Sequence, residues 1–247
     1  MQQPYYMAYE KRYEAVFAAG VKRWGHSPED AVLYNTLKAW VEENSLKGKT
    51  IIEYACGEGA CGVILSELGC IYHGVDISLS AIGKSRELLK AYPNATVKVL
   101  DMVRESVNGK FDAALDCMGL HMLITDNDRK MYLQNACKSL KEGAPMLFFR
   151  ESYRRDESYQ GKVDSIEEWS LITGDDYTTP QPRKVRNESD GSVSEVLIPL
   201  LPARAKNKEG YVEEFAVAGF AVENFVEMDV SAAIPHSATV YARKKLR

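Results

Sequence analysis

From residue 50 to residue 150, short apolar segments alternate with amphipathic segments of helical length. This alternation is typical of βαβ units, in which parallel strands are joined by helices that pack on the faces of a sheet. The apolar segments predict strands at 50–55, 71–76, 96–100, 112–117 and 145–150. The amphipathic segments predict helices at 59–68, 79–91 and 126–141, with a short turn near 103–107. An α/β fold with a parallel sheet follows.

Two helices are predicted ahead of this region. Residues 8–24 place aromatic and apolar side chains three and four residues apart, which predicts an amphipathic helix. Ser27 followed by Pro28 predicts the start of a second helix over 28–44, because serine caps helices and proline favours the first helical position. The chain therefore opens with helices and not with a strand.

The alternation stops after Arg150 for about fifty residues that are rich in charge, tyrosine and turn-forming residues. Within them, residues 184–200 predict a β-hairpin that turns at Asp190-Gly191. The remaining sequence predicts a helix at 207–218 and strands at 220–229 and 237–244. Because a short linker separates these last two strands, we expect an antiparallel hairpin at the edge of the sheet.

Length and composition limit the class of protein. The 247 residues suit a single α/β domain, and 45% hydrophobic with 27% charged residues excludes a disordered or fibrous chain. The formal net charge of -4 argues against a broad nucleic-acid surface, which needs clustered lysine and arginine. We therefore expect no nucleic-acid partner.

The termini and the cysteines bear on location and on metals. The sequence contains no apolar segment long enough for a signal peptide or a transmembrane helix, so we expect a cytoplasmic protein without membrane contact. Its five cysteines are odd in number and form no C-x-x-C pair. We expect reduced thiols, with neither a disulfide framework nor a metal site.

The segment Gly57–Gly62 matches G-x-G-x-x-G between a predicted strand and a predicted helix. Asp76 follows Gly57 by 76 − 57 = 19 residues, at the end of the second strand. An acid there can accept hydrogen bonds from both ribose hydroxyls of an adenosine. The alternative is a tight turn needed for helix packing, with Asp76 as a helix cap.

Two further acids help to distinguish a dinucleotide from S-adenosylmethionine as the cofactor. Glu53 precedes the glycines, where a carboxylate would repel a pyrophosphate but would tolerate the sulfonium of S-adenosylmethionine. The alternative for Glu53 is a carboxylate bonded to backbone amides. Asp101 ends the third strand, where it can bind an adenine amino group or cap the following turn. Together the acids favour S-adenosylmethionine.

The order of these motifs resembles the class I methyltransferases over about residues 48–150. The matching segments are Glu53-x-Ala55-Cys56-Gly57-x-Gly59, Gly74-Val75-Asp76-Ile77-Ser78, Asp101-Met102, Phe111-Asp112 and Leu140-Lys141-Glu142-Gly143. The family often has glycine where this chain has Ala55. The resemblance implies a Rossmann-like, seven-stranded, mostly parallel sheet with an antiparallel last strand and helices on both faces. We also expect an N-terminal helical cap and an insertion after the fifth strand.

The resemblance also implies which residues contact S-adenosylmethionine. The predicted cofactor-binding residues are Tyr13, Trp24, Glu53, Ala55, Cys56, Gly57, Gly59, Asp76, Ile77, Asp101, Met102, Cys117 and Met118. Tyr13 and Trp24 belong to the cover formed by the first helix, and the stretch from Trp24 to Pro28 resembles the entry segment of thiopurine- and tellurite-type methyltransferases. Core packing is the alternative for these aromatic residues.

The acceptor site is predicted at the carboxyl end of the fourth strand. His121 is the candidate catalytic base, because its pKa range suits proton transfer, although it can instead pack or bond to backbone. The predicted substrate-binding residues are Arg150, Tyr153 and Trp169; the alternative there is a solvated surface of mixed charge. The segment after the fourth strand lacks the N-P-P-Y type of loop seen in relatives that methylate nitrogens of nucleobases and proteins. Its absence favours a small-molecule acceptor.

The resulting prediction is a single S-adenosylmethionine-dependent methyltransferase domain. It transfers a methyl group to N, O or S of a small molecule by direct displacement and releases S-adenosylhomocysteine. The predicted parts are a helical cap (1–47), a cofactor-binding core (48–150), an insertion shaping the acceptor site (151–205) and a closing helix and strands (206–247). The alternatives are an NAD(P)-linked reductase and an inactive cofactor-binding protein; cysteine spacing gives little support to metalloid methylation. The acceptor and the oligomeric state are not predicted.

Overall fold

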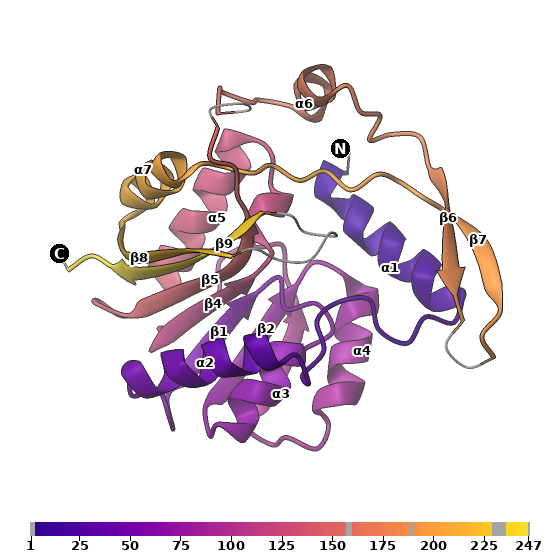
Figure 1. The fold of residues 1–247 in the computed structure, drawn as a ribbon. Coiled ribbons are helices and arrows are strands. Elements are labelled where there is room, and N and C mark those ends of the chain that lie inside the picture. Colours follow the sequence, from indigo (N-terminus) through magenta and orange to yellow (C-terminus); the bar gives the residue numbers. More distant parts are fainter. Residues whose placement is uncertain (1–2, 157–159, 188–189, 229–235, 247) are drawn as a thin grey trace.

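A seven-stranded sheet forms the centre of the computed structural model, which describes residues 3–156, 160–187, 190–228 and 236–246 (Figure 1). The strand order is β3-β2-β1-β4-β5-β9-β8. The first five strands are parallel, and β9 runs antiparallel to β5 and to β8. The strands are β1 (Thr50–Tyr54), β2 (Ile71–Asp76), β3 (Ala95–Val99), β4 (Ala113–Cys117), β5 (Pro145–Ser152), β8 (Phe220–Met228) and β9 (Ser237–Lys244). The predicted mostly parallel sheet with one reversed strand is confirmed.

Helices cover both faces of the sheet (Figure 1). One face carries α2 (Ala31–Glu43), α3 (Ala60–Glu67) and α4 (Leu79–Leu89), and the other carries α5 (Asp126–Ser139) and α7 (Lys208–Ala218). Successive residues of β1 separate the two cores, because neighbouring side chains of a strand point to opposite faces. Ile51 packs with the α2 and α3 side, whereas Ile52 packs with the α5 and α7 side.

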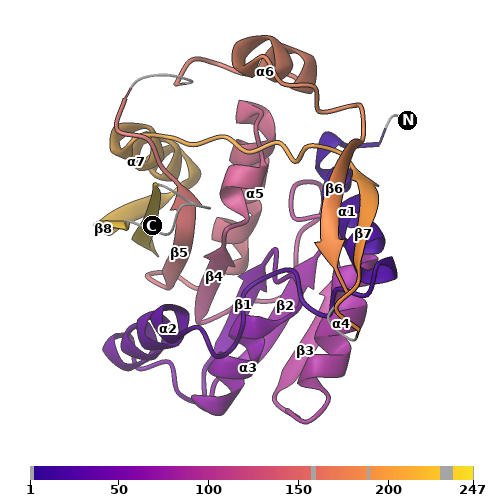
Figure 2. The same cartoon turned by 45° about the vertical axis from the view of Figure 1, so that its right-hand side comes forward.

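The two N-terminal helices lie in different places. The short η1 (Tyr5–Met7) and α1 (Ala8–Ala18) lie near the carboxyl ends of the first strands, beside α4 (Figure 2). In contrast, α2 packs on a face of the sheet with Leu37 and Trp40 fully buried. Of the segment predicted as a helical cap, η1 and α1 lie over the strand ends, whereas the apolar face of α2 joins the core.

The boundaries of these helices differ from the sequence prediction. Helix α1 ends at Ala18, well before residue 24, because the chain turns at Gly20 with φ +85°. The second helix begins at Ala31 and not at Pro28. Asp30 is its cap, and its Oδ1 accepts the backbone N–H of Val32 at 2.9 Å.

The segment after β5 contributes a hairpin and one helix. The predicted hairpin is confirmed as β6 (Gln181–Arg186) and β7 (Val193–Ile198), and it packs against α1 through Val16, Val185 and Ile198. Helix α6 (Ile166–Thr173) was not predicted; it starts where Ser165 Oγ accepts the N–H of Glu168. The last residue of the predicted strand 220–229 lies outside the described residues.

None of the helices in the described part of the chain combines the length and the apolar character that a membrane crossing requires.

Candidate functional site

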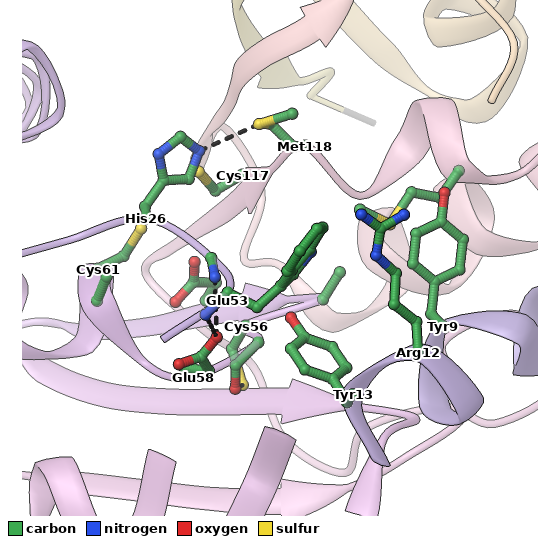
Figure 3. A pocket seen from close by; sticks show the side chains of 16 residues that line it. Tyr9, Arg12, Tyr13, His26, Glu53, Cys56, Glu58, Cys61, Cys117 and Met118 are labelled. Atoms are coloured by element: carbon green, nitrogen blue, oxygen red, sulfur yellow. Dashed lines mark hydrogen bonds between the residues drawn. The ribbon is translucent and has the colours of Figure 1, made fainter. Parts of the chain in front are cut away.

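Two adjoining cavities lie at the carboxyl ends of β1 to β4, beneath α1. The larger has a volume of about 290 Å³ and the smaller about 70 Å³. Both are lined by Tyr9, Tyr13, Ala55 and Met122, so they share one wall. Figure 3 shows the larger cavity with Tyr9, Arg12 and Tyr13 on the side of α1. The site therefore consists of two neighbouring cavities, with α1 on one side of both.

The glycine-rich turn forms the floor of the larger cavity. Gly57 has φ +52°, and a β-carbon on it would lie 3.1 Å from the hydroxyl of Tyr13, so the bare backbone lets α1 approach the turn closely. Gly59 lines neither cavity, contrary to its predicted contact with a cofactor. A β-carbon on Gly59 would lie 2.5 Å from Ser85 Oγ. Its physical role is the close packing of α3 on α4.

Two strand-end acids line the smaller cavity. The two carboxylate oxygens of Asp76 accept the N–H groups of Gly57 and Ser78, each at 2.8 Å. Burial raises the pKa of Asp76 to about 6, although these bonds act in the opposite direction. Asp101 accepts the N–H of Val103 at 2.9 Å, so it caps the following turn while facing the cavity. Ile77 and Met102 supply apolar walls.

Glu53 reaches the larger cavity from the middle of the sheet. Its side chain is almost fully buried, and the hydroxyl of Tyr72 donates a hydrogen bond to it. Burial, with the nearby Cys117, raises the pKa of Glu53 well above its usual range. The groups that bond it, Tyr72 and the Cys61 thiol, bring no positive charge. A cation bound in the larger cavity would therefore favour the ionised form of Glu53.

Sulfur and imidazole groups meet at the end of β4. Cys117, Met118 and Cys61 line the larger cavity together with His26. Hydrogen bonding from Cys61, followed by the nearby His26, lowers the pKa of the Cys117 thiol to about 5 against the effect of burial. His26 Nε2 lies 3.1 Å from Met118 Sδ, as Figure 3 shows. His26 Nδ1 lies 3.3 Å from an N–H donor, Arg150 Nη1.

The loop after α1 is tied to the glycine-rich turn. Oε1 of Glu58 accepts the backbone N–H groups of Trp24 at 2.6 Å and Gly25 at 2.8 Å. The guanidinium carbon of Arg12 lies 3.7 Å from the centre of the Trp24 ring. Glu58 thereby holds the aromatic part of the cover directly over the site.

His121 lines neither cavity. Its Nδ1 lies 2.8 Å from Glu151 Oε2, which also accepts the backbone N–H of His121 at 2.8 Å. Burial lowers the pKa of His121 to about 4. The packing role that the sequence left open therefore describes its position, and the geometry gives no support to its predicted role as base. Asp116, likewise buried, accepts bonds from Tyr132 and from the N–H of Gly119.

The three predicted substrate-binding residues also lie outside both cavities. Arg150 is buried beside the site, with its Nη1 2.7 Å from Asp30 Oδ2. Tyr153 donates to Glu227 at 3.0 Å, and Trp169 is buried in a separate cluster with Ile124 and Val163. Arg150 lies within β5, which continues to Ser152 between β4 and β9, and Tyr153 directly follows this strand.

Several lining residues were missed by the sequence prediction. They are Tyr6, Arg12, His26, Glu58, Cys61 and Met122. A signal was present for Tyr6, which precedes the cover residues Tyr9 and Tyr13 at helical spacing. The sequence contains no comparable signal for His26, because its approach depends on the path of the chain after Gly20.

Comparison with known proteins agrees with this arrangement. Residues 51–143 match a family described as a methyltransferase domain. They include the glycine-rich turn and the three strand-end acids, in a sheet of the expected order. Residues 51–143 are thus similar to a methyltransferase domain.

The curated relatives match only part of the chain. A ubiquinone biosynthesis O-methyltransferase of Paraburkholderia phytofirmans is 25% identical over 121 residues, which are 49% of this chain and 52% of that protein. The chain thus spans about half the length of the curated relatives it matches.

Solved structures show the same fold over nearly the whole chain. An S-adenosylmethionine-dependent methyltransferase from Clostridium acetobutylicum superimposes with a TM-score of 0.65, covering 97% of this chain and 99% of that one at 16% identity. Magnesium protoporphyrin IX methyltransferase from Synechocystis, with bound S-adenosylmethionine, also gives 0.65, covering 99% of each chain at 13% identity.

Proposed function

We propose that this protein uses S-adenosylmethionine to methylate N, O or S of a small molecule and releases S-adenosylhomocysteine. The observation that carries the proposal is the pair of adjoining cavities. The smaller has Asp76 and Asp101 at two strand ends, and the larger is lined by Gly57 of the glycine-rich turn. We assign the adenosine to the side of the smaller cavity and the methionine chain to the turn side of the larger one.

The residues present suit each part of this cofactor. Asp76 is the partner for the ribose hydroxyls, and Asp101 with Met102 borders the adenine. In the larger cavity, the buried Glu53 has neutral partners only and a raised pKa, so a sulfonium provides the positive charge that its ionised form needs. A dinucleotide would instead place a pyrophosphate near this acid.

For methyl transfer by displacement, the protein has to align the nucleophile, the methyl carbon and the sulfur, and it has to exclude water. When bound, S-adenosylmethionine supplies an electrophilic methyl group on a positively charged sulfur. Met118, Met122 and Tyr9 form walls around the remaining space in the larger cavity. Helix α1 and the Trp24 loop close the site toward solvent, held there by Glu58.

His26 replaces His121 as the histidine beside the reacting groups. Burial lowers the pKa of His26, but the nearby Cys117 outweighs it and raises this pKa overall. Its Nε2 lies toward Met118 and its Nδ1 lies 3.3 Å from Arg150 Nη1.

Calorimetric titrations with S-adenosylhomocysteine and with NADH test the proposal. We expect micromolar or tighter binding of S-adenosylhomocysteine and no binding of NADH. The opposite result would establish the reductase alternative. Transfer of labelled methyl groups to a panel of amines, thiols and hydroxyl compounds tests turnover; binding without transfer across the panel would favour an inactive cofactor-binding protein.

We also propose a cytoplasmic protein with a small-molecule acceptor and no nucleic-acid or membrane partner. The support is the negative net charge and the five buried cysteines, which suit a reducing compartment. A fluorescent fusion and cell fractionation test the location; recovery in a membrane pellet would contradict it.

A further inference from the structure

Arg12 places an uncompensated guanidinium in the wall of the larger cavity. Its side chain lines the cavity from α1, and its Nε is buried without a hydrogen-bond partner. Burial lowers its pKa, and the next groups that act on it are Tyr9, Arg183 and Tyr13, none of which is a carboxylate. Burying a guanidinium without an anion costs free energy. Within the described residues, the site therefore has a positive group that lacks a counter-ion.

Trp24 fixes the orientation of this guanidinium. The guanidinium carbon of Arg12 lies 3.7 Å from the ring centre, so one face of the plane is covered. The indole is itself held in place, because Glu58 accepts the N–H of Trp24 at 2.6 Å. A guanidinium stacked in this way offers its N–H edge to a ligand, and that fork matches the two oxygens of a carboxylate.

The surrounding charges favour an anion. Arg183, on the hairpin strand β6, acts on Arg12 as a second positive charge. The hairpin lies beside α1 because Val185 packs against Val16. Of the acids that line the cavity, Glu58 is bonded to backbone N–H groups and Glu53 is buried with a raised pKa. Neither neutralises Arg12.

The position of Arg12 points to the acceptor and not to the cofactor. Figure 3 shows Arg12 beside Tyr9, on the opposite side of the cavity from Glu53 and Cys56. The methionine part of S-adenosylmethionine is proposed to lie along the turn that contains Cys56. The guanidinium thus faces the space that remains for the other reactant.

We infer that Arg12, stacked on Trp24, binds a carboxylate of the methyl acceptor, so the substrates are small carboxylic acids. This inference rests on the proposed function, because it presupposes that S-adenosylmethionine occupies the turn side of the site. Arg12 contacts the substrate away from the reacting atom and determines specificity without taking part in the displacement.

The test uses the full chain saturated with S-adenosylhomocysteine. The probes are 3-hydroxybenzoate, anthranilate and 3-mercaptopropionate, each compared by calorimetry with its uncharged amide. We expect at least one acid to bind, and its amide to bind at least about tenfold more weakly, the scale of a lost charged hydrogen bond. Binding of no acid, or equal binding of acid and amide, would overturn the inference.

Variants of α1 test whether Arg12 binds a carboxylate of the methyl acceptor or the carboxylate of the cofactor. Arg12→Gln should weaken the acid at least about tenfold, and Arg12→Lys should weaken it less, because lysine keeps the charge and loses the fork. Lys11→Gln, an exposed neighbour on the same helix, is the matched control and should change nothing.

S-adenosylhomocysteine, titrated alone, distinguishes failure of the inference from failure of the proposed function. Its affinity should stay within about threefold of wild type in Arg12→Gln. A loss of tenfold or more would assign Arg12 to the carboxylate of the cofactor and overturn the acceptor site. If wild type does not bind S-adenosylhomocysteine, the proposed function itself fails.

Discussion

The carboxylate of Glu58 accepts the backbone N–H of Trp24 at 2.6 Å, across 34 residues of sequence. Glu58 belongs to the glycine-rich turn, and Trp24 belongs to the loop that follows α1. One side chain therefore connects the cofactor turn to the cover. Because the same oxygen also accepts the N–H of Gly25 at 2.8 Å, the link is a pair of charge-assisted hydrogen bonds.

We predict that Glu58→Ala loosens the cover. Loss of the two bonds should weaken S-adenosylhomocysteine binding by about 1.5–3 kcal/mol, through a faster dissociation rate. Stopped-flow displacement measures that rate. Glu14→Ala, on an exposed part of α1, is the control and should leave it unchanged. An unchanged rate in Glu58→Ala would mean that the link does not close the site.

Asp76→Ala should weaken S-adenosylhomocysteine binding by about 1.5–3 kcal/mol, because the ribose hydroxyls lose a charged acceptor. Asp76→Asn removes the charge and preserves the glycine-rich turn, since an amide oxygen can still accept the N–H of Gly57. Calorimetry on both variants at neutral pH provides the measurement. Full affinity in both would refute the ribose role.

The raised pKa of Asp76 also predicts a pH dependence. Burial places this pKa at about 6, above the ordinary value of 3.8, so Asp76 loses its charge as the pH falls through about 6. Affinity for S-adenosylhomocysteine should be constant above pH 7 and should decline below pH 6. The decline should be absent in Asp76→Asn; an identical decline there would assign it to another group.

Glu53 should distinguish the positively charged cofactor from its neutral-sulfur product. Its ionised form attracts a sulfonium, so Glu53→Gln should weaken S-adenosylmethionine more than S-adenosylhomocysteine, by about tenfold in their ratio. Since its pKa is raised, the wild-type ratio should also increase with pH as Glu53 ionises. Parallel titrations from pH 6 to 9 measure both effects. A ratio that is insensitive to pH and to the substitution would contradict a charged contact.

His121→Ala should lower stability and leave the chemistry unchanged. The buried imidazole bonds Glu151 at 2.8 Å, and its removal leaves a buried carboxyl group without that partner, so the free energy of unfolding should fall by about 1–3 kcal/mol. Urea unfolding measures this loss. The pH profile of methyl transfer should keep its shape, whereas a lost limb in the profile would restore His121 as the base.

Much of the fold was predictable because its signals are local. Short apolar segments specify buried parallel strands, and the carboxyl ends of such strands meet at one edge of the sheet. The sequence therefore predicts that Asp76 and Asp101, far apart in the chain, share a site, and both line the smaller cavity. The Gly57 turn was likewise predictable, because only glycine leaves the backbone bare at such a position.

Helix starts were less predictable, because several residues compete for the cap. Ser27-Pro28 and Asp30 all have the chemistry of a helix start. The structure selects Asp30, which caps α2 through Val32 and also meets Arg150 at 2.7 Å. That second contact involves a residue 120 positions away, so no local pattern records it.

By itself, the sequence determined the order of strands and helices, the glycine-rich turn and the acids that follow two strands, because each depends on periodicity or on one residue's backbone freedom. Only the tertiary structure decided which side chains meet in the cavity. It brings in Arg12 by the packing of α1 and His26 by the path of the chain after Gly20, and it leaves His121 and Trp169 in packed surroundings. The reason is physical: the direction of a side chain at the site depends on how distant segments pack, and packing is a property of the whole fold.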